Sequence, residues 1–150
     1  MTLLPDHVHD IAGAIQLALA PAFLLTGIAG MLNVMTGRLG RIMDRSRAVV
    51  VEASGGDAAT LEWMRRQLRT LERRRRYASY AITACTIAAL LLCSVIASLF
   101  IEAMFDAPLK WLIGGLFTAA TITLVVGLSF FLREVHMAMR TIRIPGGEGE

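Results

Sequence analysis

Three stretches of the chain contain no charged residue: 11–37, 77–101 and 111–132. Each reaches the length of about 20 residues that a helix needs to cross the hydrocarbon of a bilayer. Backbone groups find no water at that depth, so a helix is the structure that satisfies their hydrogen bonds. The pattern predicts an all-α integral membrane protein of one domain, residues 1–150, with spanning helices at about 11–36, 77–101 and 111–132.

The segment between the first two spans has a periodic pattern instead. Apolar residues recur at intervals of three and four over 39–50 and again over 61–71, as in amphipathic helices. Gly55 and Gly56 separate the two helices. We therefore expect residues 38–76 to form a long antiparallel helical hairpin, a coiled coil that extends the first two spans. Its expected packing residues are Leu39, Ile42, Met43, Ser46, Val49, Leu61, Met64, Leu68 and Leu71.

A reversal of the chain at Gly55 fixes which residues of the hairpin face each other. It places Ile42 opposite Leu68, and the two apolar seams then coincide layer by layer. Extended into the membrane, the same register places Gly30 opposite Tyr80 and Gly27 opposite Thr83. We expect close packing of the first two spans there, because small residues let helices approach in lipid.

The composition and the charge pattern fix the environment and the orientation. Apolar residues make up 55% of the chain, more than a soluble domain of this size buries. Residues 38–76 hold eleven arginines and five acidic residues, which indicates a cytoplasmic segment. Acidic residues predominate in 1–10 and 102–110, and three arginines follow the third span. We expect a multi-pass protein of a bacterial inner (plasma) membrane, with the N-terminus outside, the hairpin and C-terminus cytoplasmic, and 141–150 a disordered tail.

Polar and small residues of the first span fall along one broad face. They are candidates either for lining a pore or for contacts between helices: Gln16, Thr26, Gly27, Gly30 and Asn33. Polar groups are costly in hydrocarbon and are usually placed for a function or a contact. Neutral amides favour the helix contact. The three uncharged runs offer no ionisable group for ion-coupled transport, which leaves a passive pore as the transport hypothesis.

Four consecutive arginines precede the second span: Arg73, Arg74, Arg75 and Arg76. Anionic lipid headgroups attract such clusters by about 1 kcal/mol per charge, so we expect these residues to bind headgroups. The cluster has no interleaved aromatic residues of the kind that stack on bases, and we expect no nucleic-acid partner.

Other catalytic or metal-binding chemistry has little support in the sequence. His7, His9 and Asp10 are weak candidates for a metal site, but zinc takes three or four ligands in fixed geometry. We therefore expect no metal and no cofactor. The sequence has no glycine-rich phosphate loop and no nucleophile motif, so we expect no enzyme.

Residues 15–47, IQLALAPAFLLTGIAGMLNVMTGRLGRIMDRSR, together with ERRRRY at 72–77, resemble a family of bacterial membrane proteins known as domain of unknown function family 2721. The resemblance covers about residues 7–140. It implies a three-helix membrane protein with no established activity. The expected arrangement is also similar to that of the TolQ, ExbB and MotA proton-channel subunits, which place a large cytoplasmic segment on long helical extensions and assemble as oligomers around a pore. TolQ and ExbB share the expected order of three spans with the N-terminus outside.

The leading functional hypothesis from the sequence is a homo-oligomeric membrane assembly that forms a passive pore for ions or small solutes. The alternative is a non-catalytic scaffold or accessory subunit that docks another membrane complex. The expected partners are accordingly anionic membrane lipids, further copies of this chain and another membrane protein.

Overall fold

The computed structural model describes residues 4–52, 58–105 and 108–140, without the side chains of 4–10, 52, 58–61 and 140. They form three helices, α1 (Leu4–Glu52), α2 (Ala58–Phe105) and α3 (Lys110–Arg140). Because the described residues contain no strand, the predicted all-α fold is confirmed. The expected turn at Gly55 and the expected tail at 141–150 lie outside the described residues.

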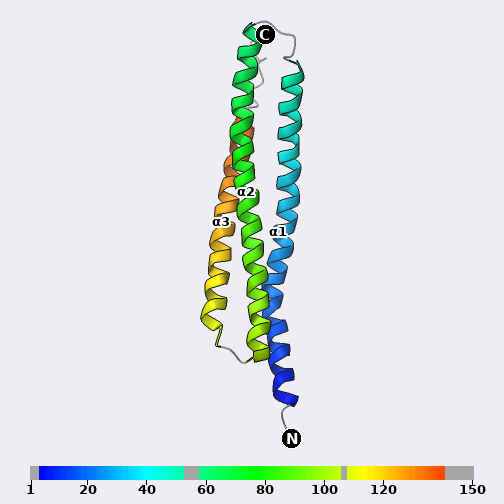
Figure 1. Cartoon of the computed structure of the whole chain (residues 1–150), viewed down its shortest axis with the longest axis vertical. Coiled ribbons are helices and arrows are strands. Elements are labelled where there is room, and N and C mark those ends of the chain that lie inside the picture. The colour runs from blue at the N-terminus through cyan, green and yellow to red at the C-terminus, as the bar shows by residue number, and fades with distance from the viewer. Residues whose placement is uncertain (1–3, 53–57, 106–107, 141–150) are drawn as a thin grey trace, which may run out of the picture.

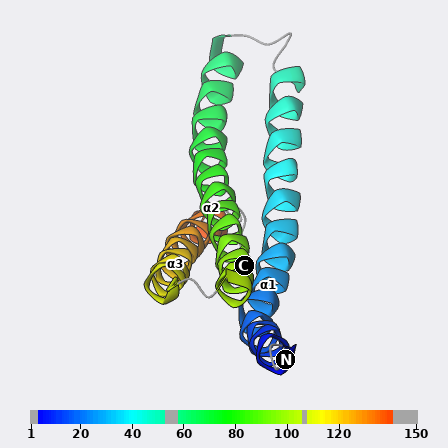
Figure 2. The ribbon, with the colours of Figure 1, turned by 60° about the horizontal axis from the view of Figure 1, so that its bottom comes forward.

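All three helices are long and apolar enough to cross a membrane. α1 and α2 contain 49 and 48 residues and run antiparallel, each combining a predicted span with one arm of the predicted hairpin (Figure 1). At a rise of 1.5 Å per residue each is about 70 Å long, more than twice the thickness of the hydrocarbon. α3, with 31 residues, is shorter and lies along only part of α2 (Figure 2). The predicted three-helix membrane architecture with a long hairpin is therefore confirmed.

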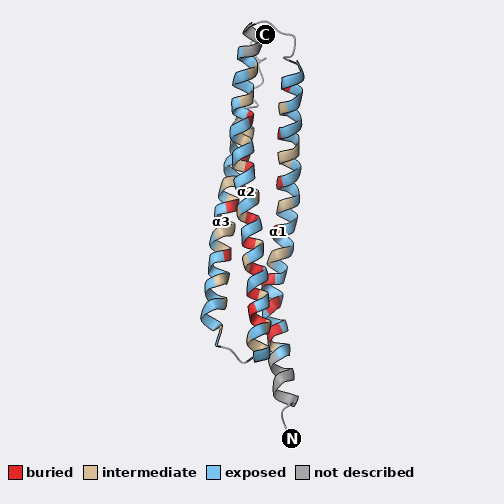
Figure 3. Cartoon of the chain, in the orientation of Figure 1, coloured by how far each residue is buried: buried red, intermediate tan, exposed pale blue. Residues whose placement is uncertain are grey.

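Buried residues recur at intervals of seven along the helices. In α1 they are Ala14, Pro21, Ile28, Met35, Ile42 and Val49. In α2 one such row is Leu71, Ala78, Cys85, Leu92 and Leu99, and a second is Ala81, Ala88 and Val95. A repeat of seven keeps one stripe of a helix facing its neighbour over many turns. α2 has two adjacent rows because it packs against both α1 and α3, and Figure 3 shows the buried positions concentrated along it.

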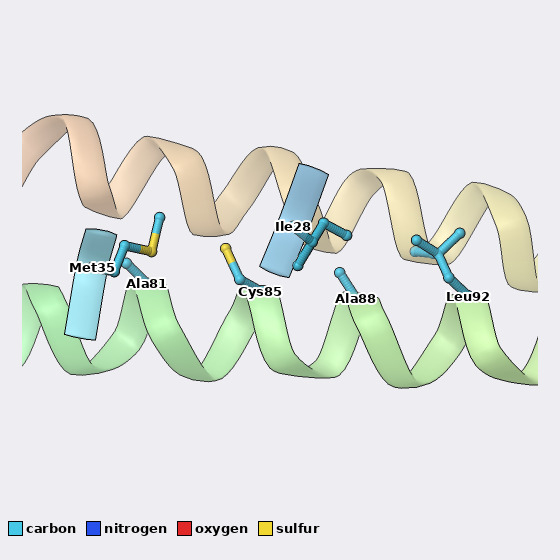
Figure 4. Packing of buried hydrophobic residues seen from close by; sticks show 7 residues of the cluster. Ile28, Met35, Ala81, Cys85, Ala88 and Leu92 are labelled. Atoms are coloured by element: carbon cyan, nitrogen blue, oxygen red, sulfur yellow. The ribbon is translucent and has the colours of Figure 1, made fainter. Parts of the chain in front are cut away.

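The main core lies where the three helices meet in the membrane-spanning part. It consists of Ile28, Met35, Ala81, Cys85, Ala88, Leu92 and Ala120. Figure 4 shows Cys85, Ala88 and Leu92 extending from α2 toward α3. Many of these side chains are small, which allows the helix backbones to approach closely where lipid gives no hydrophobic force between helices. Gly127 of α3 is one such position, because an added Cβ there would lie 2.9 Å from Cys85 Sγ.

The expected close packing at Gly27 and Gly30 was wrong. An added Cβ at either glycine would meet nothing within 4 Å, and Tyr80 instead lies against Phe130 of α3. The reason is the seven-residue repeat of α1, which turns Ile28 and Met35 toward α2. At 100° per residue, Gly30 lies on the opposite side of the helix from this stripe.

The hairpin beyond the membrane-spanning part has a smaller core. Ile42, Val49 and Leu71 are buried together, and the half-buried Met64 and Leu68 pack against them. A groove of about 410 Å³ lies between α1 and α2 beside this cluster, lined by Ile42, Met43, Ser46, Arg47, Leu68, Leu71, Glu72 and Arg75. The two arms therefore touch along an apolar seam that is only partly filled.

Candidate functional site

A carboxylate on α3 connects all three helices. The side chain of Glu134 is only 1% exposed, and its two oxygens accept hydrogen bonds from Arg38 of α1 and Arg74 of α2, each at 3.3 Å. The two arginine side chains are 34% and 21% exposed. Burial of a charge is costly unless it is paired, and this carboxylate has one guanidinium on each side. We call these three residues the arginine–glutamate triad.

The triad lies where the uncharged spans end on the hairpin side. Arg38 is the first charged residue after the first span, and Glu134 follows the third span by two residues. Glu134 also continues a row on α3 in which Ala120 and Gly127 are buried at intervals of seven. The same repeat that packs the helices in the membrane therefore brings one carboxylate to the end of the core, level with the arginines.

Aromatic side chains pack beside the triad. The Arg38 guanidinium carbon lies 5.6 Å from the centroid of the Phe131 ring, a cation–π geometry. Phe130 contacts two tyrosines of α2, with ring centroids 6.3 Å from Tyr77 and 5.8 Å from Tyr80. Tyrosines favour the boundary between hydrocarbon and headgroups, so Tyr77 and Tyr80 indicate the same position for that boundary as the triad does.

The triad carries more positive than negative charge, because two guanidiniums share one carboxylate. The Nε atom of Arg74 is buried and has no hydrogen-bond partner among the described residues. Arg74 also lines an open groove of about 520 Å³ at the end of α3, together with Arg69, Thr70, Glu72, Arg73, Arg76 and Met137. The arrangement is suited to holding helices together and to attracting an anion.

The structure separates the four arginines that were predicted to bind headgroups. Arg74 turns to Glu134, and Arg76 donates to Glu72 at 3.1 Å on the surface. Arg73 lies in the groove at the end of α3, whereas Arg75 lines the groove on the α1 side. Helical geometry explains the separation, because successive residues point about 100° apart.

The pore or helix-contact candidates all lie on the surface of the single chain. Gln16, Thr26, Gly27, Gly30 and Asn33 are exposed, and none belongs to the core between helices. The Thr26 hydroxyl donates to the carbonyl of Ala22 at 3.2 Å. These residues therefore lie on the outward surface of α1, spread over about 120° of its circumference.

The hairpin candidates are brought together in part. Ile42, Val49, Leu71, Met64 and Leu68 form the cluster described above. Leu39 and Ser46 are half-buried, while Met43 is 39% exposed. The side chain of Leu61 is outside the described part.

The side chains of the weak metal candidates His7, His9 and Asp10 are not described. Among the residues that the structure describes, no group of three histidine, cysteine or acidic side chains comes together as a metal site.

Glu134 is the functional candidate that sequence reasoning missed. It stands just beyond the third uncharged run, so the absence of charge that defines the spans does not mark it. Two signals were present: its spacing of seven and fourteen residues from Gly127 and Ala120, and its position as the sole acidic residue in 111–147. An isolated acid that continues an apolar stripe points to a buried partner of opposite charge.

The fold and the triad together define a class, a three-helix membrane protein with an ion-paired boundary and a long basic hairpin. Within that class, the chain belongs to the family DUF2721, described as proteins of unknown function, whose family model matches residues 18–144. No curated protein and no solved structure matched the chain. The comparisons thus support the family resemblance and give no support to the looser likeness to proton-channel subunits.

Proposed function

We propose that this protein is a non-catalytic subunit of a homo-oligomeric membrane assembly whose copies meet through the outward face of α1. The observation that carries the proposal is the position of Thr26, Gly30, Asn33 and Gly37. All four are exposed, and at 100° per residue they lie opposite the stripe of Ile28 and Met35 that packs on α2. We call this set the outward face of α1.

Asn33 is the member of this face that most favours a partner. Its amide carries two donors and an acceptor, and no hydrogen bond joins its side chain to another described residue. Asn33 precedes Arg38 by five residues, about 7.5 Å along the helix, which places it inside the apolar zone. In lipid, an amide gains about 1 kcal/mol from an interhelical hydrogen bond. Gly30 and Gly37 on either side would let a second helix approach closely.

A pore, if the assembly contains one, lies between copies. Within one chain the three helices meet around fully buried side chains such as Cys85, Ala88 and Leu92. Around an axis of symmetry, Asn33, Thr26 and Gln16 would supply rings of neutral polar groups, which suit a passive path for ions or small solutes. The excess of arginine in the hairpin supports a cytoplasmic stalk and a bacterial inner membrane.

The alternative function, a scaffold or accessory subunit for another membrane complex, draws support from the hairpin. The groove of about 410 Å³ between its arms is partly apolar and is open at the surface. A helix or loop of a partner protein would fill it in the manner of a helix in a groove. In that case the outward face of α1 would contact the partner instead of a second copy.

The test is the native mass of the full chain in lipid nanodiscs. We expect a single multimer for the wild type and loss of that multimer in Gly30→Leu, because a side chain there separates the helices. Asn33→Leu is expected to weaken assembly about fivefold to tenfold. Val125→Leu, at a 64% exposed position of α3, is the control and should leave the mass unchanged.

A monomeric wild type, or a multimer unaffected by both α1 substitutions, contradicts the proposal. A monomer that copurifies with another complex through the hairpin favours the alternative. Bilayer recordings address the pore separately: a conductance that changes in Asn33→Leu or Gln16→Leu supports it. A multimer without conductance removes the pore and leaves the assembly intact.

A further inference from the structure

We propose that the groove at the end of α3 binds the phosphate of one anionic phospholipid, with Arg69 and Arg73 as its principal ligands. The groove is lined by four arginines and one acidic residue, against Met137 of α3. The inference depends on the helices spanning a membrane and is independent of whether the chain forms oligomers.

The charges in the groove are only partly balanced within the chain. Glu72 is paired with Arg76 at 3.1 Å, and Glu134 is shared between Arg74 and Arg38. Among the described residues, Arg69 and Arg73 have no acidic partner. They are four residues apart on α2, a spacing that places their Cβ atoms about 6 Å from each other and makes like charges repel. One anion held between them would turn that repulsion into two favourable contacts.

The chemistry of the groove fits a phosphate. Guanidinium groups donate paired, parallel hydrogen bonds that match the oxygens of a phosphate. Arg74 lines the same groove and has a buried Nε without an acceptor. Because this atom is closed to solvent, Arg74 adds positive charge to the groove, whereas the exposed Arg69 and Arg73 supply the accessible donors.

The position of the groove relative to the expected membrane favours a lipid as the source of that phosphate. Tyr77 begins the second uncharged span, and Arg73 precedes it by four residues, about 6 Å along the helix. The headgroup layer on each side of the hydrocarbon is about 5–7 Å thick, so Arg73 lies at the level of lipid phosphates. Arg69 lies one turn further from the membrane, and its long side chain reaches back to the level of the phosphates. An anionic lipid is favoured over a zwitterionic one because the groove has excess positive charge.

The test compares two double variants of the full chain that remove the same charge. The groove variant is Arg69→Gln with Arg73→Gln. The control is Arg41→Gln with Arg45→Gln on α1; these exposed arginines lie about 4.5 and 10.5 Å beyond Arg38, at heights similar to those of the groove pair. A general attraction to an anionic surface acts over about 8–10 Å and would be weakened equally in both variants. A site would be weakened only in the groove variant.

Binding is measured by native mass spectrometry of the protein in nanodiscs with increasing phosphatidylglycerol in phosphatidylcholine. We expect one retained phosphatidylglycerol per chain, a loss of affinity of about tenfold or more in the groove variant, and a change below twofold in the control. Circular dichroism verifies that both variants keep the helicity of the wild type.

Three results would overturn the proposal. The two double variants losing phosphatidylglycerol equally would show a general field in place of a site. Phosphatidylcholine retained as strongly as phosphatidylglycerol would show that the headgroup charge is not recognised. Displacement of the lipid by millimolar inorganic phosphate, with binding of that phosphate in phosphatidylcholine nanodiscs, would identify a soluble anion as the ligand.

Discussion

Gly127 of α3 lies directly against Cys85 of α2, with an added Cβ at Gly127 only 2.9 Å from the Cys85 sulfur. The same Cβ would lie 3.3 Å from the backbone carbonyl oxygen of Ala81, which has little freedom to move. A residue without a side chain is therefore required at this point of the α2–α3 contact.

Gly127→Ala is expected to destabilise the fold by about 1–3 kcal/mol, because the extra methyl group has to push the two helices apart. The measurement is thermal unfolding of the full chain in detergent. Gly114→Ala on the same helix is the control, since nothing lies within 4 Å of a Cβ there. If both substitutions have the same effect, the close contact at Gly127 is not what stabilises the α2–α3 packing.

Two leucines on α2 allow the contribution of packing to stability to be distinguished from that of hydrophobicity alone. Leu92 is 0% exposed in the core, whereas Leu90 is 63% exposed toward the surroundings. Leu92→Ala should cost about 2–5 kcal/mol through loss of contacts and the cavity that remains. Leu90→Ala should change stability by less than about 0.5 kcal/mol, because lipid is an equivalent apolar environment. Denaturation in mixed micelles compares the two, and a similar loss in both would show that Leu92 is not packed against α3.

The sequence predicts the hairpin better than the contacts inside the membrane. Over 39–50 and 62–71 polar residues occupy the other sides of the helices, so apolar residues mark the sides that meet, and Ile42 lies in one cluster with Leu68 and Leu71. In the uniformly apolar span, hydrophobicity does not distinguish a side facing lipid from a side facing a helix. The seven-residue spacing of Ile28 and Met35 marks the contact there, whereas the small residues Gly27 and Gly30 lie away from it.

The position of α3 could not be derived from local pattern. Arg38 and Glu134 are separated by 96 residues and Arg74 and Glu134 by 60. Charge alone does not decide which arginine pairs with Glu134, because the sequence contains 14 arginines. The choice among them depends on which face of α2 receives α3, and that in turn depends on small residues such as Gly127, which hydropathy does not weight.

The orientation of the hairpin gives a prediction for chemical labelling. Arg65 on the hairpin and Lys110 at the start of α3 are both exposed and lie at opposite ends of the spans. In intact spheroplasts, a membrane-impermeant maleimide is expected to label Lys110→Cys and to reach Arg65→Cys only after lysis. The unsubstituted protein is the control for its native thiols, which lie in the apolar span. Labelling of Arg65→Cys before lysis would invert the proposed topology.

The arginine–glutamate triad gives the prediction that involves all three helices. Glu134→Gln removes the charge and leaves Arg38 and Arg74 partly buried without a carboxylate. Breaking a buried ion pair by removing one partner costs about 3–5 kcal/mol, and partial exposure of the two arginines reduces the expected loss to about 2–4 kcal/mol. Glu62→Gln is the control, because Glu62 and Arg66 form a surface pair with side chains 67% and 78% exposed. That pair should contribute less than about 1 kcal/mol.

A double-mutant cycle tells a true triad from a carboxylate that is merely buried. If Glu134 stabilises the fold through Arg38, then the double variant Arg38→Gln with Glu134→Gln should lose less stability than the sum of the two single losses. The difference is expected to be about 1–3 kcal/mol. The same holds for Arg74→Gln, so both arms of the triad should show coupling when unfolding is followed in lipid. Additive losses in both cycles would mean that the hydrogen bonds at 3.3 Å contribute little. Coupling to Arg74 alone would show that the ion pair holds α3 against α2, and that α1 is held in place by the apolar stripe of Ile28 and Met35.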